Sequence, residues 1–224
     1  MERSLHRQLK ERYGVAIGGR SEVVVGGFRV DALAPDGRLV EIQSSPLGLL
    51  KGKLSRLLPD HSIDVIKPVI VSRRVIQRKT PDGADLSSRR SPKRGLFVDA
   101  FEELVGLARL FPHPNLRIEL LAVEIDEIRV ARRRRPGFVV VDRTLRAVGE
   151  SIRLEQAGDL WTLLPEGLGE RFSTEDLARK VGRSTRFAQQ ITYCLRHSGA
   201  ADVVAKVGNR RIYARSETVL SGSV

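Results

Sequence analysis

Cysteine is nearly absent from this chain of 224 residues, in which Cys194 is the one example. A single thiol excludes an internal disulfide framework, and it excludes any zinc site that several cysteines would build. Four histidines, scattered along the chain, do not restore that zinc site. The scarcity of cysteine fits a reducing compartment, so we expect a cytoplasmic protein.

Long apolar runs are also missing. No run approaches the roughly 20 residues that a membrane-spanning helix needs, and the first stretch, MERSLHRQLKERYG, is too polar for a secretory signal. The glycine-rich stretches at 14–20 and 23–28 lack the spacing of a nucleotide-binding loop. Hydrophobic residues still form 41% of the chain, which is enough for a real core. The sequence therefore predicts a soluble intracellular protein that does not span a membrane.

Positive charge is abundant but confined to two segments. Residues 73–94 carry eight Lys or Arg against two acids, and residues 129–146 carry seven against one, which together account for the net charge of +12. Such localised charge favours a polyanionic partner, with nucleic acid, duplex DNA in particular, as the first candidate and an anionic membrane as a distant second. A solvated surface, or a localisation tag at 131–137, remains the alternative.

The pattern of apolar and turn residues predicts a mixed α/β domain over residues 1–130. Hairpin signals at Gly26-Gly27 and Pro35-Asp36-Gly37 separate its first strands. A near-continuous apolar strand after the second helix indicates a buried, parallel position, with a bulge or edge at Pro68. The expected helices are 4–13, 47–58 and 97–111, and the expected strands are 22–25, 28–34, 38–44, 64–75 and 116–130.

Two segments are expected to lie outside this pattern. Residues 77–94 combine turn formers and positive charges without periodicity, which predicts a mobile basic loop. Residues 131–158 are expected to form a basic linker and a separate hairpin, with strands near 137–142 and 145–154.

The last part of the chain, residues 159–218, has the order helix, short turn, helix, hairpin. Ser173 or Thr174 and Ser184 or Thr185 are caps for the two helices, and glycine ends each of them. The order resembles a winged-helix domain, in which the second helix enters the DNA major groove. Trp161 is expected in its core. A winged helix that contacts only protein is the alternative. The expected DNA-binding residues are Arg183, Arg186, Lys206, Arg210 and Arg211.

Two carboxylates interrupt the apolar strands before and after Pro35-Asp36-Gly37. If that turn is a three-residue connection, paired residue numbers add to 72, and Asp31 lies opposite Glu41. Gln43, two residues beyond Glu41, projects from the same face. A divalent cation such as Mg²⁺ or Mn²⁺ would offset the repulsion between the carboxylates. Ion pairs with Arg29, Arg38 or another basic side chain are the alternative.

The acid, followed by EIQSS on its hairpin partner, resembles the PD-(D/E)XK nuclease superfamily. With the amino-terminal ERSLHRQLK, it is similar to CoiA-like competence proteins over approximately residues 1–75. The resemblance implies a restriction-endonuclease-like mixed sheet flanked by helices. It also implies that the metal is bound by Asp31, Glu41 and the carbonyl of Ile42, and that Gln43 orients the attacking water. Glu2 and His6 match the first-helix residues of such sites.

The lysine that is usual at the end of this motif is replaced by Gln43. A neutral amide orients water but does not supply positive charge to the phosphate, which Lys51 or Lys53 on the next helix could provide. We therefore expect a metal-dependent DNA nuclease with a winged-helix DNA-binding module. A non-catalytic DNA-binding regulator and an RNA-processing factor are the alternatives, and homodimerisation is left open.

Overall fold

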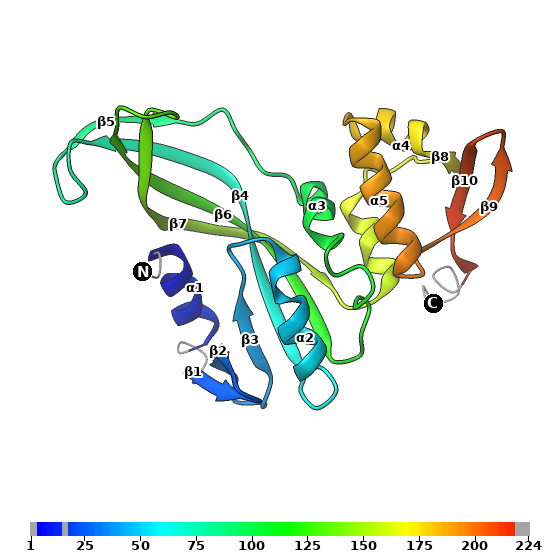
Figure 1. The fold of residues 1–224 in the computed structure, drawn as a ribbon, viewed down its shortest axis with the longest axis horizontal. Coiled ribbons are helices and arrows are strands. Elements are labelled where there is room, and N and C mark those ends of the chain that lie inside the picture. The colour runs from blue at the N-terminus through cyan, green and yellow to red at the C-terminus, as the bar shows by residue number, and fades with distance from the viewer. Residues whose placement is uncertain (1–3, 15–17, 218–224) are drawn as a thin grey trace. The chain divides into compact units, whose positions relative to one another are not determined.

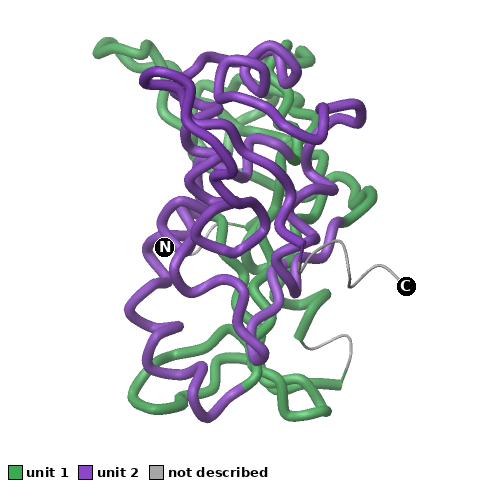
Figure 2. The backbone as a smooth tube through the Cα atoms, turned by 90° about the vertical axis from the view of Figure 1, so that its right-hand side faces the viewer, with its two compact units in different colours: residues 1–44, 62–97, 119–151 green, residues 45–61, 98–118, 152–224 purple. Residues whose placement is uncertain are grey.

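The computed structural model describes residues 4–14 and 18–217, and they form two compact units. Unit 1 comprises residues 1–44, 62–97 and 119–151, and unit 2 comprises residues 45–61, 98–118 and 152–224 (Figure 2). The fold is α/β, as the sequence predicted, with a mixed sheet flanked by helices. No helix of the described residues is long and apolar enough to cross a membrane.

Unit 1 is built on a seven-stranded sheet in which the order is β1-β2-β3-β4-β6-β7, with β5 paired to β4 (Figure 1). One helix, α1 (Ser4–Tyr13), precedes the first strand. The sheet strands are β1 (Arg20–Val25), β2 (Phe28–Leu33), β3 (Leu39–Ile42), β4 (Ile63–Arg78), β5 (Asp85–Arg90), β6 (Leu116–Ala131) and β7 (Phe138–Leu154).

The hairpin between β2 and β3 has the predicted register. Ala32 pairs with Val40 and Leu33 with Leu39, so paired numbers add to 72. The N–H of Ala34 donates to the carbonyl of Arg38 at 2.8 Å, which closes the three-residue turn. β3 then pairs in parallel with β4, as the apolar character of β4 predicted.

A hydrophobic core lies between α1 and the sheet. Leu5 and Leu9, four residues apart on one helical face, pack with apolar residues of β2, β3, β4 and β6. Two polar contacts connect α1 to β7: Ser4 N–H donates to Asp142 at 3.0 Å, and Gln8 accepts from Leu145 N–H at 2.8 Å. α1 is therefore held against both the central strands and the outer strand β7.

Two predictions for the basic segments are wrong. Residues 77–94 are not a loop, because β4 continues to Arg78 and turns back into β5. Every residue of β5 is exposed, so the strand has no buried face that would require alternating apolar residues. Backbone pairing to β4 defines it. Residues 138–154 form the single strand β7 rather than a separate hairpin, and 132–137 is the turn that joins it to β6.

Unit 2 begins with short helices: η2 (Leu47–Leu50), α2 (Lys51–Leu57), η3 (Phe97–Ala100, of which Phe97 is assigned to unit 1), α3 (Phe101–Leu104) and η4 (Ala157–Leu163). The helix expected at 97–111 is thus shorter than predicted. A Cβ at Gly106 would lie 2.6 Å from the Cα of Gly48, so the chain after α3 passes directly against η2. Glycine at both positions permits this close approach.

The remainder of unit 2 has the predicted order of two helices and a hairpin. The elements are β8 (Arg171–Ser173), α4 (Thr174–Val181), α5 (Thr185–His197), β9 (Ala201–Val207) and β10 (Arg210–Arg215). Ser173 and Ser184 cap the helices as expected, and Gly182 ends α4 in the left-handed conformation. Trp161 is buried, and its indole N–H donates to the carbonyl of Ala200 at 3.0 Å.

The two units interleave along the chain, which differs from the contiguous segments 1–130, 131–158 and 159–218 expected from the sequence. The β6–β7 hairpin belongs to the first unit because its strands extend the large sheet. Residues 45–61 and 98–118 belong to the second because their short helices pack together and on α5. Amino-acid composition along the chain does not reveal that the segments of the two units alternate.

Candidate functional site

Asp31 is held from two directions at the end of the β2–β3 pairing. Its Oδ2 accepts a hydrogen bond from the backbone N–H of Ile42 at 2.8 Å, and its Oδ1 lies 3.0 Å from Nε2 of His6. The printed pairs of β2 and β3 end at Ala32 and Val40, one step before Asp31 and Glu41, and the N–H of Ile42 is bound by the side chain of Asp31. The structure thus brings His6 of α1 to the acid with which the sequence grouped it.

The two arginines that offered an alternative role for these acids bind other carboxylates. Arg29 donates to Glu22, and Arg38 donates to Asp64 through Nε and Nη2 at 2.9 and 2.6 Å. These ion pairs lie along the same strands as Asp31 and Glu41. Both arginines thus have a carboxylate partner other than Asp31 and Glu41.

A lysine that sequence reasoning missed is the neighbour of Gln43 on β4. The parallel register pairs Glu41 with Val65 and Ile42 with Ile66, and Gln43 N–H donates to the carbonyl of Ile66 at 2.9 Å. The next pair is therefore Gln43 with Lys67, whose side chains leave one face of the sheet on strands about 4.8 Å apart. Lys67 is only 7% exposed.

Pro68 explains why the pairing ends here. The next bond of a parallel ladder would run from the N–H of residue 68 to the carbonyl of Gln43, and proline has no N–H. β3 ends at Ile42, while β4 continues past the proline. The proline that the sequence placed at a bulge or edge thus lies where β4 loses its β3 partner.

Three predicted site residues remain. Lys51 and Lys53 lie on α2, which belongs to unit 2, whereas the acids belong to unit 1. Glu2 lies outside the described residues. The signal for Lys67 was available only through the pairing of β3 with β4, because 24 residues separate it from Gln43 in the chain.

The donors at this site suit a hard cation. Asp31, Glu41 and the carbonyl of Ile42 would supply oxygen atoms, which Mg²⁺ and Mn²⁺ prefer. Within residues 4–14 and 18–217, no group of three or more His, Cys, Asp or Glu side chains is arranged to hold a metal ion. His6, Asp31 and Glu41 are therefore not arranged as such a group.

A second feature of unit 1 is the pair of basic hairpins, β4–β5 and β6–β7, called here the basic arm (residues 73–94 and 126–146). Glu127 of β6, with a side chain 1% exposed, binds arginines from three strands. Arg129 and Arg143 donate to it at 2.5 to 2.9 Å, and Arg73 lies at 3.4 Å. Burial alone would raise the pKa of Glu127, but these three cations together lower it.

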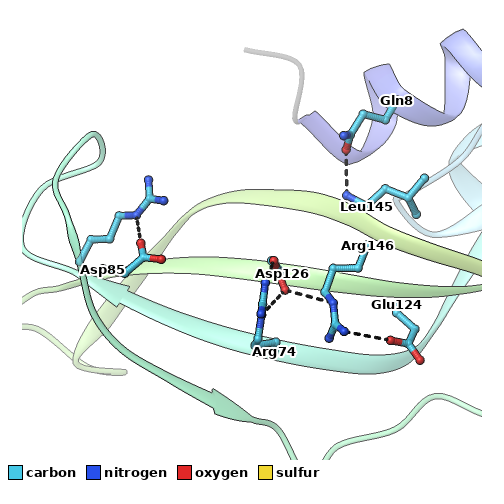
Figure 3. Close-up of polar contacts among 8 residues, drawn as sticks. Gln8, Arg74, Asp85, Glu124, Asp126, Leu145 and Arg146 are labelled. Carbon is cyan, nitrogen blue, oxygen red and sulfur yellow. Dashed lines mark hydrogen bonds and ion pairs between the residues drawn. The ribbon is translucent and has the colours of Figure 1, made fainter.

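Asp126, the preceding residue, organises the opposite face of β6. Arg74 of β4 donates to it through Nε at 2.8 Å, and Arg146 of β7 lies 3.8 Å from Asp126 and 3.8 Å from Glu124 (Figure 3). At the outer end of the arm, Arg78 donates to Asp85 at 2.7 Å. Ion pairs thus connect β4, β6 and β7 on both faces of the sheet.

In unit 2, a polar groove of about 640 Å³ separates α5 from the β9–β10 hairpin. Lys206, Arg210 and Arg211, three of the residues expected to bind DNA, line it. Arg186 is exposed on α5 but does not line the groove, and Arg183 donates to Asp99 at 2.6 Å. The groove also contains residues that sequence reasoning missed, namely Gln189, Tyr193, Arg196 and Asn209.

Together, the fold and these sites define a two-unit α/β protein with an acidic hairpin site and a basic arm on its larger sheet. Residues 3–155 match the family described as "Domain of unknown function (DUF8091)", and the chain belongs to this family. An "Uncharacterized protein" of Treponema pallidum (strain Nichols) is 35% identical over 222 residues, which cover 96% of this chain and 85% of the relative. No solved structure matches.

Proposed function

We propose that the protein is a metal-dependent nuclease that hydrolyses phosphodiester bonds in DNA. The observation that carries the proposal is the position of Asp31, which is fixed by His6 and by the N–H of Ile42, the residue that follows Glu41 in the chain. The order α1-β1-β2-β3-α2-β4, with an antiparallel hairpin followed by a parallel strand, is the order that the PD-(D/E)XK resemblance implies.

Asp31, Glu41 and the carbonyl of Ile42 would hold Mg²⁺ or Mn²⁺ in this proposal. When bound, the cation lowers the pKa of a coordinated water and offsets the charge of the phosphate. The imidazole of His6 holds the carboxylate of Asp31 in one orientation. The amide of Gln43 both donates and accepts hydrogen bonds, so it orients the attacking water without taking its proton.

Lys67 supplies the positive charge that a glutamine at position 43 lacks. Its side chain leaves the same face of the sheet as that of Gln43, one strand away. An ammonium group in a largely buried position stabilises a developing phosphate charge more strongly than one in water, because the local dielectric constant is low. Lys67 therefore replaces Lys51 and Lys53 in the proposed site.

The helices and hairpin of unit 2 act in the proposal as a winged helix that holds duplex DNA. The support is the order α4, α5, β9, β10 and the presence of Arg196, Lys206, Arg210 and Arg211 along one groove. A DNA-binding protein without nuclease activity is the second candidate. The neutral amide of Gln43 favours it, since the usual final lysine of the motif is replaced.

Cleavage of plasmid DNA by the purified full chain tests the proposal. We expect nicking that requires Mg²⁺ or Mn²⁺ and that is lost in Asp31→Asn and in Glu41→Gln. Asp36→Asn is the matched control, because Asp36 is an exposed acid in the turn of the same hairpin. Equal cleavage by wild type and both site variants would assign the activity to a contaminant and leave the non-catalytic candidate.

A further inference from the structure

Nine basic residues of the arm remain exposed after its ion pairs are assigned. Six of the fifteen basic residues in segments 73–94 and 129–146 bind Asp85, Glu124, Asp126 or Glu127. For the other nine, the structure of residues 4–14 and 18–217 describes no carboxylate partner. They are Lys79, Arg89, Arg90, Lys93, Arg94, Arg132, Arg133, Arg134 and Arg135.

Four of these cations follow β4. Gly95 N–H donates to the carbonyl of Ile70, and Arg74 pairs with Arg90, so the order along β4 toward its turn is Arg94, Lys93, Arg90 and Arg89. From Ile70 to Arg78 is eight residues, or about 26 Å of strand. Over the same length a nucleic-acid duplex presents roughly 15 phosphate charges, at about one per 1.7 Å of axis.

The basic stretch along β4 begins close to the acidic hairpin site within the same unit. Ile70 is three residues beyond Lys67 on β4, a distance of about 10 Å along the strand. The segment 91–95 lies along β4 just after the point where β3 has left it at Pro68. A duplex bound along β4 therefore has one end of its bound stretch near the acidic hairpin site.

We infer that the basic arm is a binding surface for the phosphate backbone of duplex nucleic acid, and that it holds the substrate along β4. The inference rests on the proposed function for the identity of the substrate, but the binding itself needs no cleavage. The ion pairs of Asp126 and Glu127 fix the strands, and the nine exposed cations contact phosphates without reading bases. The length of the basic stretch along β4 suits a duplex, which presents phosphate charges continuously over it.

Duplex binding by the full chain in a chelating buffer tests the arm. Fluorescence anisotropy with a 20-bp labelled DNA duplex is measured at several salt concentrations for two double variants, Arg89→Ser/Arg90→Ser and Arg133→Ser/Arg134→Ser. Arg132 is left in place because its guanidinium donates to the carbonyls of Arg134 and Arg135 in the turn. Arg56→Ser/Arg109→Ser, two exposed arginines of unit 2, is the matched control.

The Arg133→Ser/Arg134→Ser variant should reduce the slope of log affinity against log salt by about 1.8, because two phosphate contacts are lost. The Arg89→Ser/Arg90→Ser variant should reduce it by about 0.9, because neighbouring strand residues leave opposite faces and one of the two faces the duplex. The control should leave the slope and the affinity unchanged. If the arm variants bind the duplex as the wild type does, the inference is wrong. It is also wrong if the variants keep their binding to the duplex and lose binding to anionic lipid vesicles. The chelator removes the metal ion, so binding is measured without cleavage. Unchanged binding by the arm variants would contradict only the binding surface, and unchanged cleavage by Asp31→Asn would contradict only the proposed nuclease.

Discussion

Nε2 of His6 lies 3.0 Å from Oδ1 of Asp31, so the first helix of the chain contacts the acid that opens the β2–β3 hairpin site. The same carboxylate accepts from the N–H of Ile42 through its other oxygen. Both oxygens of Asp31 are therefore oriented by groups from separate elements. A carboxylate held in this way has little freedom to rotate, which is what a preorganised ligand requires.

Replacing His6 should slow cleavage without unfolding the protein. We expect His6→Ala to lower kcat by about 10- to 100-fold, the usual effect of losing a group that orients a ligand. His6→Gln should recover much of the rate, because its amide nitrogen is able to take the place of Nε2. Rates are measured on supercoiled plasmid at saturating Mn²⁺. Equal rates for the alanine and glutamine variants would show that the contact does not orient Asp31.

Lys67 and Gln43 should be exchangeable as a pair. Lys67→Met should lower kcat by about 10²- to 10³-fold, comparable to loss of one charge-stabilising group. Adding Gln43→Lys to Lys67→Met should restore activity, because the ammonium then reaches the phosphate from the neighbouring strand.

Two controls belong to this experiment. Lys53→Met, on α2 of unit 2, should retain wild-type activity. The melting temperature of each variant shows whether the fold survives, since Lys67 is largely buried. An inactive but folded double variant would remove Lys67 from the proposed mechanism.

Glu127 should contribute strongly to stability at neutral pH. Glu127→Gln removes the charge that compensates Arg73, Arg129 and Arg143, and we expect a loss of about 3 kcal/mol in the free energy of unfolding. Glu124→Gln on the same strand is the control, because its contact with Arg146 is partly exposed and long at 3.8 Å, and its effect should be below about 1 kcal/mol.

The contribution of Glu127 should also depend on pH in a defined direction. The pKa of Glu127 is lowered in the folded protein, so its contribution is complete above the unfolded value of about 4.3 and disappears as pH falls through the folded value. Urea unfolding should therefore separate wild type from Glu127→Gln equally at pH 6 and 7, and less at pH 3. A difference that grows at acid pH would contradict the lowered pKa.

Arg186 of α5 and Arg183, in the turn before α5, should differ in their effect on DNA binding. Arg186 is exposed near the start of the helix, whereas Arg183 donates to Asp99 at 2.6 Å. In selection from random duplexes, Arg186→Ala should change the preferred sequence, because side chains early in a recognition helix reach base edges. Arg183→Ala should keep the preference. Identical preferences for both variants would limit α5 to backbone or protein contact.

The hairpin register could be predicted because its information is local. Pro35-Asp36-Gly37 determines the turn, and the turn determines the register, which pairs Ala32 with Val40 and Leu33 with Leu39. Lys67 could not be predicted, since its position depends on a parallel pairing whose register no short segment specifies. The strand β5 could not be recognised either, because its exposed residues carry no apolar period.

The division into units was also beyond the reach of the sequence pattern, and it affects experiments. The Cys194 thiol of α5 lies 3.7 Å from the carbonyl of Phe101, and burial raises its pKa to about 12. Both residues belong to unit 2, although 93 positions separate them. A fragment that begins near residue 155 would lack Phe101 and the rest of 98–118, so the proposed DNA binding by α5 is properly measured on the full chain.

The interleaved order has a consequence for the newly synthesised chain. β4 ends at Arg78, but its sheet neighbour β6 begins at Leu116 and β7 ends only at Leu154. At about 5–20 residues per second, several seconds pass between the emergence of β4 and that of the whole of β6. During this interval β4, with buried residues such as Val65, Ile66, Val75 and Ile76, has an open edge that invites pairing with other chains. Chaperone protection of nascent chains should therefore matter most between the synthesis of β4 and that of β6.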